Sequence, residues 1–337
     1  MNTHEHEQLS GEPESKATAT PDFSMQPSYV RTVFLGPDGL KAGWGFAFYV
    51  AMFYPLQFAA SRWAGSLKVG ALWSTMLAEF AVLAAAVIPS VVLARVEKRK
   101  WGVYGLRGRT AFGKLFWVGT GWGFAGITLL LGAMYGLRVV DFGHLAIHGG
   151  RMVKFAVFWA VFFLLVGIFE EFLLRGYSQF TLTRVIGFWP AAVLLSCTFG
   201  LIHLSNAGEE WPGLLAAAVI GLFFCLTLRR TGTLWFAVGF HAAWDWGETF
   251  FYSVPDSGTV FPGHLLKSSF HGPQWLTGGK VGPEGSVLCF VVIAVVWAGF
   301  ARVYPEVKYA IKTFNTGDPS AALRAGTEEH GGVKGFD

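Results

Sequence analysis

Long apolar runs recur along the chain and are separated by short polar stretches. They lie near residues 42–61, 70–94, 112–137, 152–174, 188–205, 212–228, 233–251 and 285–303. A helix needs about 20 residues to cross roughly 30 Å of hydrocarbon, and most of the runs approach that length. The pattern therefore predicts an all-α fold, a polytopic transmembrane helical bundle of about eight spans.

The polar segments divide the chain into successive parts. We expect a polar, disordered N-terminal tail over 1–40, three transmembrane helices over 41–150, and core helices over 151–251. An extramembrane loop over 252–284, a last helix over 285–303 and a polar tail over 304–337 follow. Residues 1–30 have no apolar core, so we expect no cleavable signal peptide, and the first span must direct the chain to the membrane.

Composition agrees with a membrane protein. Residues are 53% hydrophobic and 14% charged, whereas a soluble domain carries about 25% charged residues. The net charge of +4 gives no case for binding nucleic acid, since cytoplasmic Lys and Arg explain it. Cys197, Cys225 and Cys289 all lie in apolar runs, which predicts small buried residues rather than disulfides or a metal cluster.

The distribution of Lys and Arg predicts the orientation. Basic residues cluster after the second run, at Arg95, Lys98, Arg99, Lys100, Arg107 and Arg109. Basic loops favour the cytoplasmic side, so this loop is expected there. Alternation then places Arg184 and Arg229–Arg230 on the same side and Glu209–Glu210 on the other. With eight spans both termini are cytoplasmic, in the plasma (inner) membrane.

Two adjacent carboxylates, Glu170 and Glu171, interrupt the run over 156–174. An ionised group near the bilayer centre costs roughly 2.5–3.5 kcal/mol, so the pair must be partnered, hydrated or protonated. Arg175 is four residues after Glu171 and shares its helix face, whereas Glu170 points about 100° away. We expect Arg175 to neutralise Glu171 while Glu170 faces a cavity. A buried ion pair that only locks two helices is the alternative.

Two later runs carry further polar residues. In one, Phe199 precedes His203 by one turn; in the other, His241, Asp245 and Glu248 form a stripe at i, i+4 and i+7. Each group alone is compatible with a structural hydrogen bond. Together with Glu170, however, they supply the carboxylate and imidazoles that could activate a water molecule.

The three motifs, in this order on successive runs, resemble the CPBP family. They are Glu-Glu-x-x-x-Arg ending at Arg175, Phe-x-x-x-His ending at His203, and His-x-x-x-Asp ending at Asp245. That family contains the type II CAAX prenyl endopeptidases and Abi-type bacterial proteins linked to bacteriocin processing and self-immunity. The resemblance covers about residues 150–250 and implies an intramembrane endopeptidase with an all-helical fold.

The resemblance also implies roles for single residues. Glu170 would activate the attacking water, His203 would assist, and His241 and Asp245 would stabilise the oxyanion. Structural or positioning roles would fall to Glu171, Arg175 and Phe199. The family has been described as metal-free and as metal-dependent, so either no cofactor or a divalent metal such as Zn is implied. Two imidazoles and a carboxylate, from His203, His241 and Glu170, could hold zinc with a position open for water.

One position departs from the family. Asp245 stands where the family often has Asn, and an ionised Asp only accepts hydrogen bonds, so it cannot donate to an oxyanion. Our hypothesis is that Asp245 orients His241; protonation of Asp245 or metal binding by it are the alternatives. Loss of one oxyanion donor costs roughly 2.7–4 kcal/mol in other hydrolases, so Asp in this position could leave the protein slow or inactive.

These inferences lead to one main function and two alternatives. The main one is hydrolysis of a peptide bond in a membrane-associated, lipidated or hydrophobic substrate, with membrane lipids as the other partner. The alternatives are a non-enzymatic scaffold or immunity factor and a proton-coupled transporter, although the paired halves expected of a transporter are not seen. Glu170 and His203 lie at different depths in the predicted topology. They are level only if the helix continues past Arg175 or residues 176–187 dip into the membrane.

Overall fold

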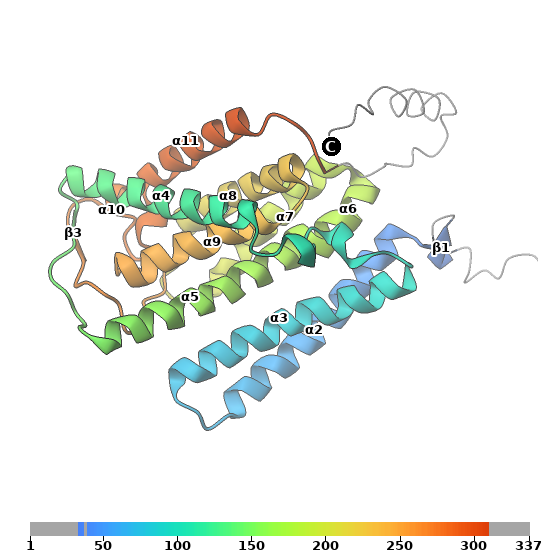
Figure 1. Ribbon diagram of the computed structural model, residues 1–337, viewed down its shortest axis with the longest axis horizontal. Helices are drawn as coiled ribbons and strands as arrows, with labels where there is room; N and C mark the ends of the chain where they lie inside the picture. Colours follow the sequence, from blue (N-terminus) through green and yellow to red (C-terminus); the bar gives the residue numbers. More distant parts are fainter. Residues whose placement is uncertain (1–32, 37–38, 310–337) are drawn as a thin grey trace, which may run out of the picture.

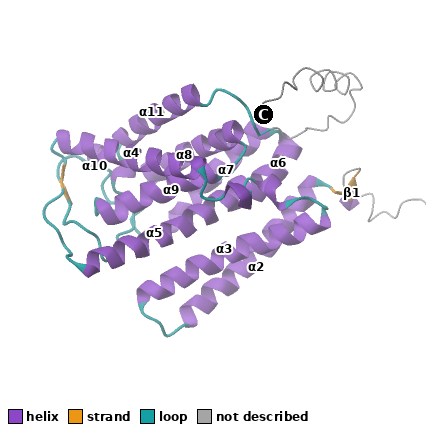
Figure 2. Ribbon diagram, viewed as in Figure 1, coloured by secondary structure: helices purple, strands orange, loops and turns teal. Residues whose placement is uncertain are grey.

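The structure, a computed structural model, describes residues 33–36 and 39–309 of the chain. Within these residues nearly every element is a helix, and the helices lie in an extended bundle (Figures 1 and 2). The predicted all-α fold is therefore confirmed. Most of the predicted N-terminal tail (1–40) and C-terminal tail (304–337) lies outside the described residues.

A helix lies in each of the apolar ranges, and one more, α6, lies between the ranges 152–174 and 188–205. The helices are α2 (Ala42–Ser66), α3 (Ala71–Val96), α4 (Lys114–Gly136), α5 (Gly150–Glu171), α6 (Gln179–Ile186), α7 (Phe188–Ile202), α8 (Trp211–Thr231), α9 (Trp235–Trp246) and α11 (Val287–Val303). Among the described residues, five segments are long and apolar enough to cross a membrane: 71–96, 114–136, 150–186, 188–205 and 211–231. The count of about eight spans stays a prediction.

Short elements join these helices. They are η1 (Trp101–Tyr104), η2 (Gly108–Thr110), η4 (His203–Ser205), α10 (Gln274–Thr277) and η6 (Pro283–Gly285). Antiparallel pairs link β1 (Leu35–Gly36) to β2 (Gly39–Leu40) and β3 (Val140–Asp141) to β4 (Ser269–Phe270). The second pair ties the segment after α4 to the predicted loop over 252–284, so that loop is anchored to the bundle.

The helix carrying the carboxylates continues well beyond Arg175. A π-helical segment, η3 (Phe172–Ser178), joins α5 to α6, so the helical run Gly150–Ile186 has 37 residues. Of the two arrangements that could level Glu170 with His203, the structure has the longer helix. Gly176 has non-helical backbone angles inside η3, with φ −83° and ψ −109°, so the helical run is kinked at this residue.

The helices follow one another across the bundle. In Figure 1 the α2–α3 hairpin lies at one edge, α5 lies beside it, and α11 lies at the opposite edge. Between them, α4 and α9 pack against each other closely. A Cβ on Gly119 would lie 2.1 Å from the Phe236 carbonyl oxygen, and one on Gly123 would lie 2.1 Å from that of Phe240. The two glycines therefore admit the backbone of α9, as a small-xxx-small pattern does.

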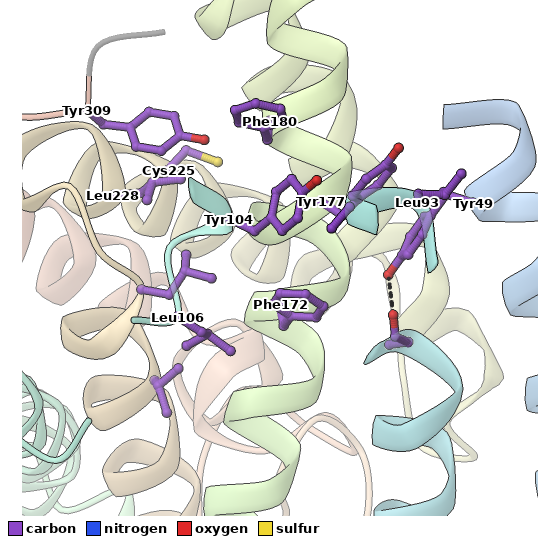
Figure 3. Packing of buried hydrophobic residues seen from close by; sticks show 14 of the residues in the cluster. Tyr49, Leu93, Tyr104, Leu106, Phe172, Tyr177, Phe180, Cys225, Leu228 and Tyr309 are labelled. Atoms are coloured by element: carbon purple, nitrogen blue, oxygen red, sulfur yellow. Dashed lines mark hydrogen bonds between the residues drawn. The ribbon is translucent and has the colours of Figure 1, made fainter. Parts of the chain in front are cut away.

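A cluster of aromatic residues fixes η3 against α2 and η1 (Figure 3). The ring of Tyr177 lies 4.8 Å from that of Tyr49 and 5.1 Å from that of Tyr104. Its hydroxyl donates to the Glu97 carboxylate at 2.7 Å. The Tyr49 hydroxyl in turn donates to the Ala86 carbonyl at 3.2 Å, the bond drawn in Figure 3. These contacts tie the end of α3 to η3.

The cysteine prediction is correct in part. All three cysteines are free, and Cys225 and Cys289 are buried. Cys197 is exposed, so its predicted burial is wrong. The reason is its place on the outward face of α7, where Leu194 and Leu201 are also exposed; an apolar residue in a membrane helix can face lipid as well as the core.

The basic loops gather at one end of the bundle. The Gly105 carbonyl accepts from the Leu234 amide at 3.0 Å, and the Arg229 carbonyl accepts from the Lys308 amide at 3.0 Å. At the other end, Gln274 donates to the Glu210 carboxylate. Loops that the distribution of Lys and Arg places on opposite sides of the membrane therefore lie at opposite ends of the bundle. Which end is cytoplasmic stays a prediction.

Candidate active site

The pair Glu171–Arg175 is fully buried. Arg175 Nη1 lies 3.2 Å from Glu171 Oε1, and both side chains have 0% exposure. The guanidinium also lies over the ring of Phe199, at 4.4 Å from its centroid. A desolvated cation over an aromatic face gains about 2 kcal/mol or more. Arg175 is therefore held by a charge on its own helix and by a ring on α7.

His241 lies at the centre of the polar site. Its Nδ1 is 3.2 Å from Glu171 Oε1, and its Nε2 is 3.5 Å from Glu170 Oε2 and 3.4 Å from Asp245 Oδ2. The Phe224 ring stacks on the imidazole, with centroids 5.6 Å apart. Ionised carboxylates only accept hydrogen bonds, so a protonated imidazole would donate from Nδ1 to Glu171 and share its Nε2–H between Glu170 and Asp245. The motifs on α5 and α9 are thus joined through one ring.

The four predicted catalytic residues converge on one cavity. Its volume is ≈ 260 Å³, and its walls include Glu170 from α5, His203 from η4, and His241 and Asp245 from α9. Glu79 of α3 also lines it. A polar cavity among apolar helices is the setting expected for ionisable groups that must avoid lipid.

His203 shows which of its nitrogens is free. Its Nδ1 lies 2.7 Å from the Phe199 carbonyl oxygen, which can only accept, so Nδ1 carries the hydrogen. In the neutral ring, Nε2 is then left as an acceptor or a metal ligand. The backbone of α7 thereby fixes the tautomer of the histidine.

A second, larger cavity meets the first. It has a volume of ≈ 560 Å³, and both cavities include Glu170, His203 and Asn206 in their walls. Most of the remaining lining is apolar and comes from α2, η3 and α7, including Phe53, Leu173 and Leu195. The polar site therefore adjoins an apolar chamber on the α2–α7 side.

Glu248 does not join the predicted stripe. The π-helical segment η5 (Gly247–Phe251) follows Trp246, and its wider turn shifts the register of the helix. His241 and Asp245 line the cavity, whereas Glu248 does not. Glu248 instead lies with Asp256 and Glu284.

Sequence reasoning missed several contributors to the site. Asn206 follows His203 by one turn and donates to the Ser257 carbonyl at 2.9 Å, yet a single Asn in a loop carries no signal. Asp256 and Glu284 come from the predicted extramembrane loop. Gly221 makes room for Arg175, because a Cβ there would lie 2.2 Å from Nη2. Only the fold shows that these positions meet.

The predicted metal set is less compact than another group of acids. Within residues 33–36 and 39–309, the cluster whose ligand atoms all lie within 4.8 Å of one another is Glu248, Asp256 and Glu284. Glu170, His203 and His241 form no such cluster there. Zinc on those three residues stays an alternative from the sequence.

The helical bundle thus brings Glu, His and Asp side chains from three elements to one cavity. Residues 152–247 match the family model of the type II CAAX prenyl endopeptidases, described as Rce1-like. The predicted CPBP resemblance is thereby confirmed over this segment, and together with the apolar helices it indicates an integral membrane protein. Neither a curated protein nor a solved structure matches the chain significantly.

Proposed function

We propose that this protein is an intramembrane endopeptidase that hydrolyses a peptide bond of a membrane-associated or hydrophobic substrate. The observation that carries the proposal is the convergence of Glu170, His203, His241 and Asp245 on one cavity. Any two of these residues could be explained by a structural contact. A base, two imidazoles and a second carboxylate on one cavity, inside apolar helices, is costly to maintain for structure alone.

Glu170 is the general base in this proposal. It takes a proton from water, and the hydroxide attacks the carbonyl carbon of the substrate. Of the two vicinal carboxylates, Glu171 is engaged by Arg175 Nη1 at 3.2 Å, which leaves Glu170 free to face the cavity. A positioned general base contributes about 10²–10⁴-fold to the rate.

In this proposal His241 stabilises the oxyanion and protonates the leaving group. Its Nδ1 is held by Glu171 at 3.2 Å, while its Nε2, 3.4 Å from Asp245 and 3.5 Å from Glu170, lies on the cavity side. When the ring is protonated, the Nε2 hydrogen can turn from these carboxylates to the developing oxyanion and then pass to the departing amine as the C–N bond breaks. Asp245 orients the imidazole by accepting from Nε2. His203 assists through its free Nε2, which can hold the water against Glu170.

The apolar cavity is the proposed place for the hydrophobic part of the substrate. Its volume of ≈ 560 Å³ lies in the range of ligand sites for small molecules. It reaches the polar site at Glu170 and His203. A peptide with an apolar or lipidated portion in this chamber would present an adjacent bond to the base.

The test compares wild type with Glu170→Gln in liposomes. Each protein is incubated with hydrophobic and lipidated peptides, and products are read by mass spectrometry. We expect cleavage by wild type and a loss of about 10²–10⁴-fold in Glu170→Gln, because the amide cannot act as a base. The matched control is Asp141→Asn, an exposed carboxylate that should leave the rate unchanged. Equal cleavage by Glu170→Gln, or none by folded wild type, contradicts the proposal.

Two further arms separate the alternatives. Asp245→Asn tests the hypothesis that Asp245 orients His241: loss of activity supports orientation or metal binding, whereas retained or raised activity supports simple oxyanion donation. Phenanthroline tests zinc. Inhibition that added Zn²⁺ reverses favours a metal on Glu170, His203 and His241, and insensitivity favours the metal-free glutamic mechanism.

A further inference from the structure

Three carboxylates meet beside the active-site cavity. They are Glu248 in η5, Asp256 in the segment after it, and Glu284 in η6. One oxygen of each lies within 4.8 Å of the other two. Like charges this close repel, so the group needs a compensating charge or protons.

Glu248 gives a second, independent observation. Its side chain has 0% exposure, and neither carboxylate oxygen has a hydrogen-bond partner. The other two acids are supported: Asp256 accepts from the Thr249 hydroxyl at 2.9 Å, and Glu284 accepts from Trp244 Nε1 at 3.2 Å. A buried, unpartnered carboxylate directed into an acidic cluster lacks a ligand that the protein does not supply.

We propose that Glu248, Asp256 and Glu284 bind a hard divalent cation of the size of Ca²⁺. The donors are all carboxylate oxygens, which Ca²⁺ and Mg²⁺ prefer to the softer ligands of zinc. Three oxygens at 2.3–2.6 Å from one Ca²⁺ are about 4.0–4.5 Å apart when spread evenly around it. The three carboxylates, whose oxygens lie within 4.8 Å of one another, can therefore reach a shared ion with small side-chain adjustments. Mg²⁺ requires a near-ideal octahedron at 2.0–2.1 Å, whereas Ca²⁺ accepts irregular oxygen geometry, so three carboxylates from separate elements suit Ca²⁺ better.

The cation would join η5 to two points of the segment that follows it, the second of them 28 residues after Asp256. Glu248 lies in η5, which continues the helix that carries His241, whereas Asp256 and Glu284 lie on the segment between α9 and α11 and also line the cavity. Binding therefore fixes that segment across the cavity. The site shares no residue with the zinc alternative, and it does not depend on whether the protein is a peptidase.

Terbium luminescence tests the site directly. Tb³⁺ substitutes for Ca²⁺ and is excited through a nearby indole, here that of Trp244, which contacts Glu284. We expect the purified full chain in detergent to show saturable Tb³⁺ emission that Ca²⁺ displaces. Trp244→Phe should weaken the emission while leaving the rise of melting temperature with Ca²⁺ in place.

Variants assign the binding to the cluster. Glu248→Gln should lower the Ca²⁺ affinity by about 10-fold or more, since a ligand charge is lost. Asp256→Asn should have the same effect and replaces Glu248→Gln in the test if that variant folds poorly. Asp141→Asn is the control and should bind as wild type does. Absence of both Tb³⁺ emission and a Ca²⁺-dependent melting shift, or equal binding by the variants, overturns the proposal in favour of carboxyl groups that share protons. A tighter response to Mg²⁺ than to Ca²⁺ overturns the assignment of size.

Discussion

Arg175 depends on the absence of a side chain at Gly221. A Cβ there would lie 2.2 Å from Nη2 and 3.0 Å from the Phe199 ring. Both neighbours are buried and held by other contacts, so neither can move without cost. We expect Gly221→Ala to lower the free energy of unfolding by about 1–3 kcal/mol, as overpacking does, in denaturation experiments in detergent.

The control for this change is Gly121→Ala. An added Cβ at Gly121 meets nothing within 4 Å, so the stability should stay the same or rise slightly. If both alanine variants changed the free energy of unfolding equally, contact with Arg175 would not be the reason for a glycine at position 221.

Glu209 predicts a dependence of stability on pH. It lies between α7 and α8, outside the spanning helices, where burial and then the Glu284 carboxylate raise its pKa from 4.5 to about 7. Between these values the folded protein binds more protons than the unfolded chain, so this residue's contribution to stability falls as pH rises. Glu209→Gln should therefore raise the melting temperature at pH 8 relative to wild type, but not at pH 4. An equal effect at both pH values, or the same pattern in the exposed Glu306→Gln, contradicts this.

Residues of the site were predictable where they interrupt an apolar run. Glu170, His203, His241 and Asp245 stand out because ionisable groups are rare in membrane helices. Asn206 and Glu284 lie in polar stretches, where such residues are ordinary, so nothing in the pattern singles them out. Their part in the site follows only from the approach of the 252–284 segment to η4.

Close packing between α4 and α9 positions His241. The Phe240 carbonyl lies directly against Gly123, so a larger residue must push α9 away from α4. Gly123→Ala should destabilise the protein by about 1–3 kcal/mol and lower peptidase activity, measured by unfolding and by the liposome assay. Gly132→Ala on the same helix has open space at its Cβ and serves as control; equal losses in the two variants would rule out the packing explanation.

Helix positions followed from apolar runs, but two helix ends did not. The apolar run over 152–174 stops at Arg175, and a charged residue in that place indicates the end of a membrane helix. Glu171, however, neutralises Arg175 inside the bundle, and the helical run continues to Ile186. The stripe of His241, Asp245 and Glu248 assumed a regular α-helix. η5 breaks that assumption, and a π-turn has no signature that a single sequence displays.

Orientation in the membrane can be tested on the whole molecule. The loop with Arg109 is expected in the cytoplasm, and His271, near β4 at the other end, outside it. Native cysteines are first replaced, because Cys197 is exposed. In intact cells, an impermeant maleimide should then label His271→Cys and reach Arg109→Cys only after permeabilisation. Labelling in the reverse order would invert the predicted topology.

The arrangement of the bundle was predictable only in part. Composition and periodicity indicate membrane helices, and the motif order indicates that three of them meet. The sequence does not show that α2 and α7 leave an apolar chamber, because its walls are residues that would serve equally well as core or lipid-facing side chains. Nor does it show that β3 and β4 anchor the long segment before α11.

The meeting of a polar and an apolar cavity at Glu170 also bears on how products leave. Hydrolysis turns one neutral amide into a carboxylate and an ammonium, both strongly hydrated. Either charge would cost roughly 2.5–3.5 kcal/mol in hydrocarbon, so in the proposed reaction neither new end can return to the apolar chamber. We expect the two fragments to dissociate, with the new termini moving toward water and the apolar portion diffusing into lipid. Such a partition makes religation unfavourable and gives turnover a direction without any external energy source.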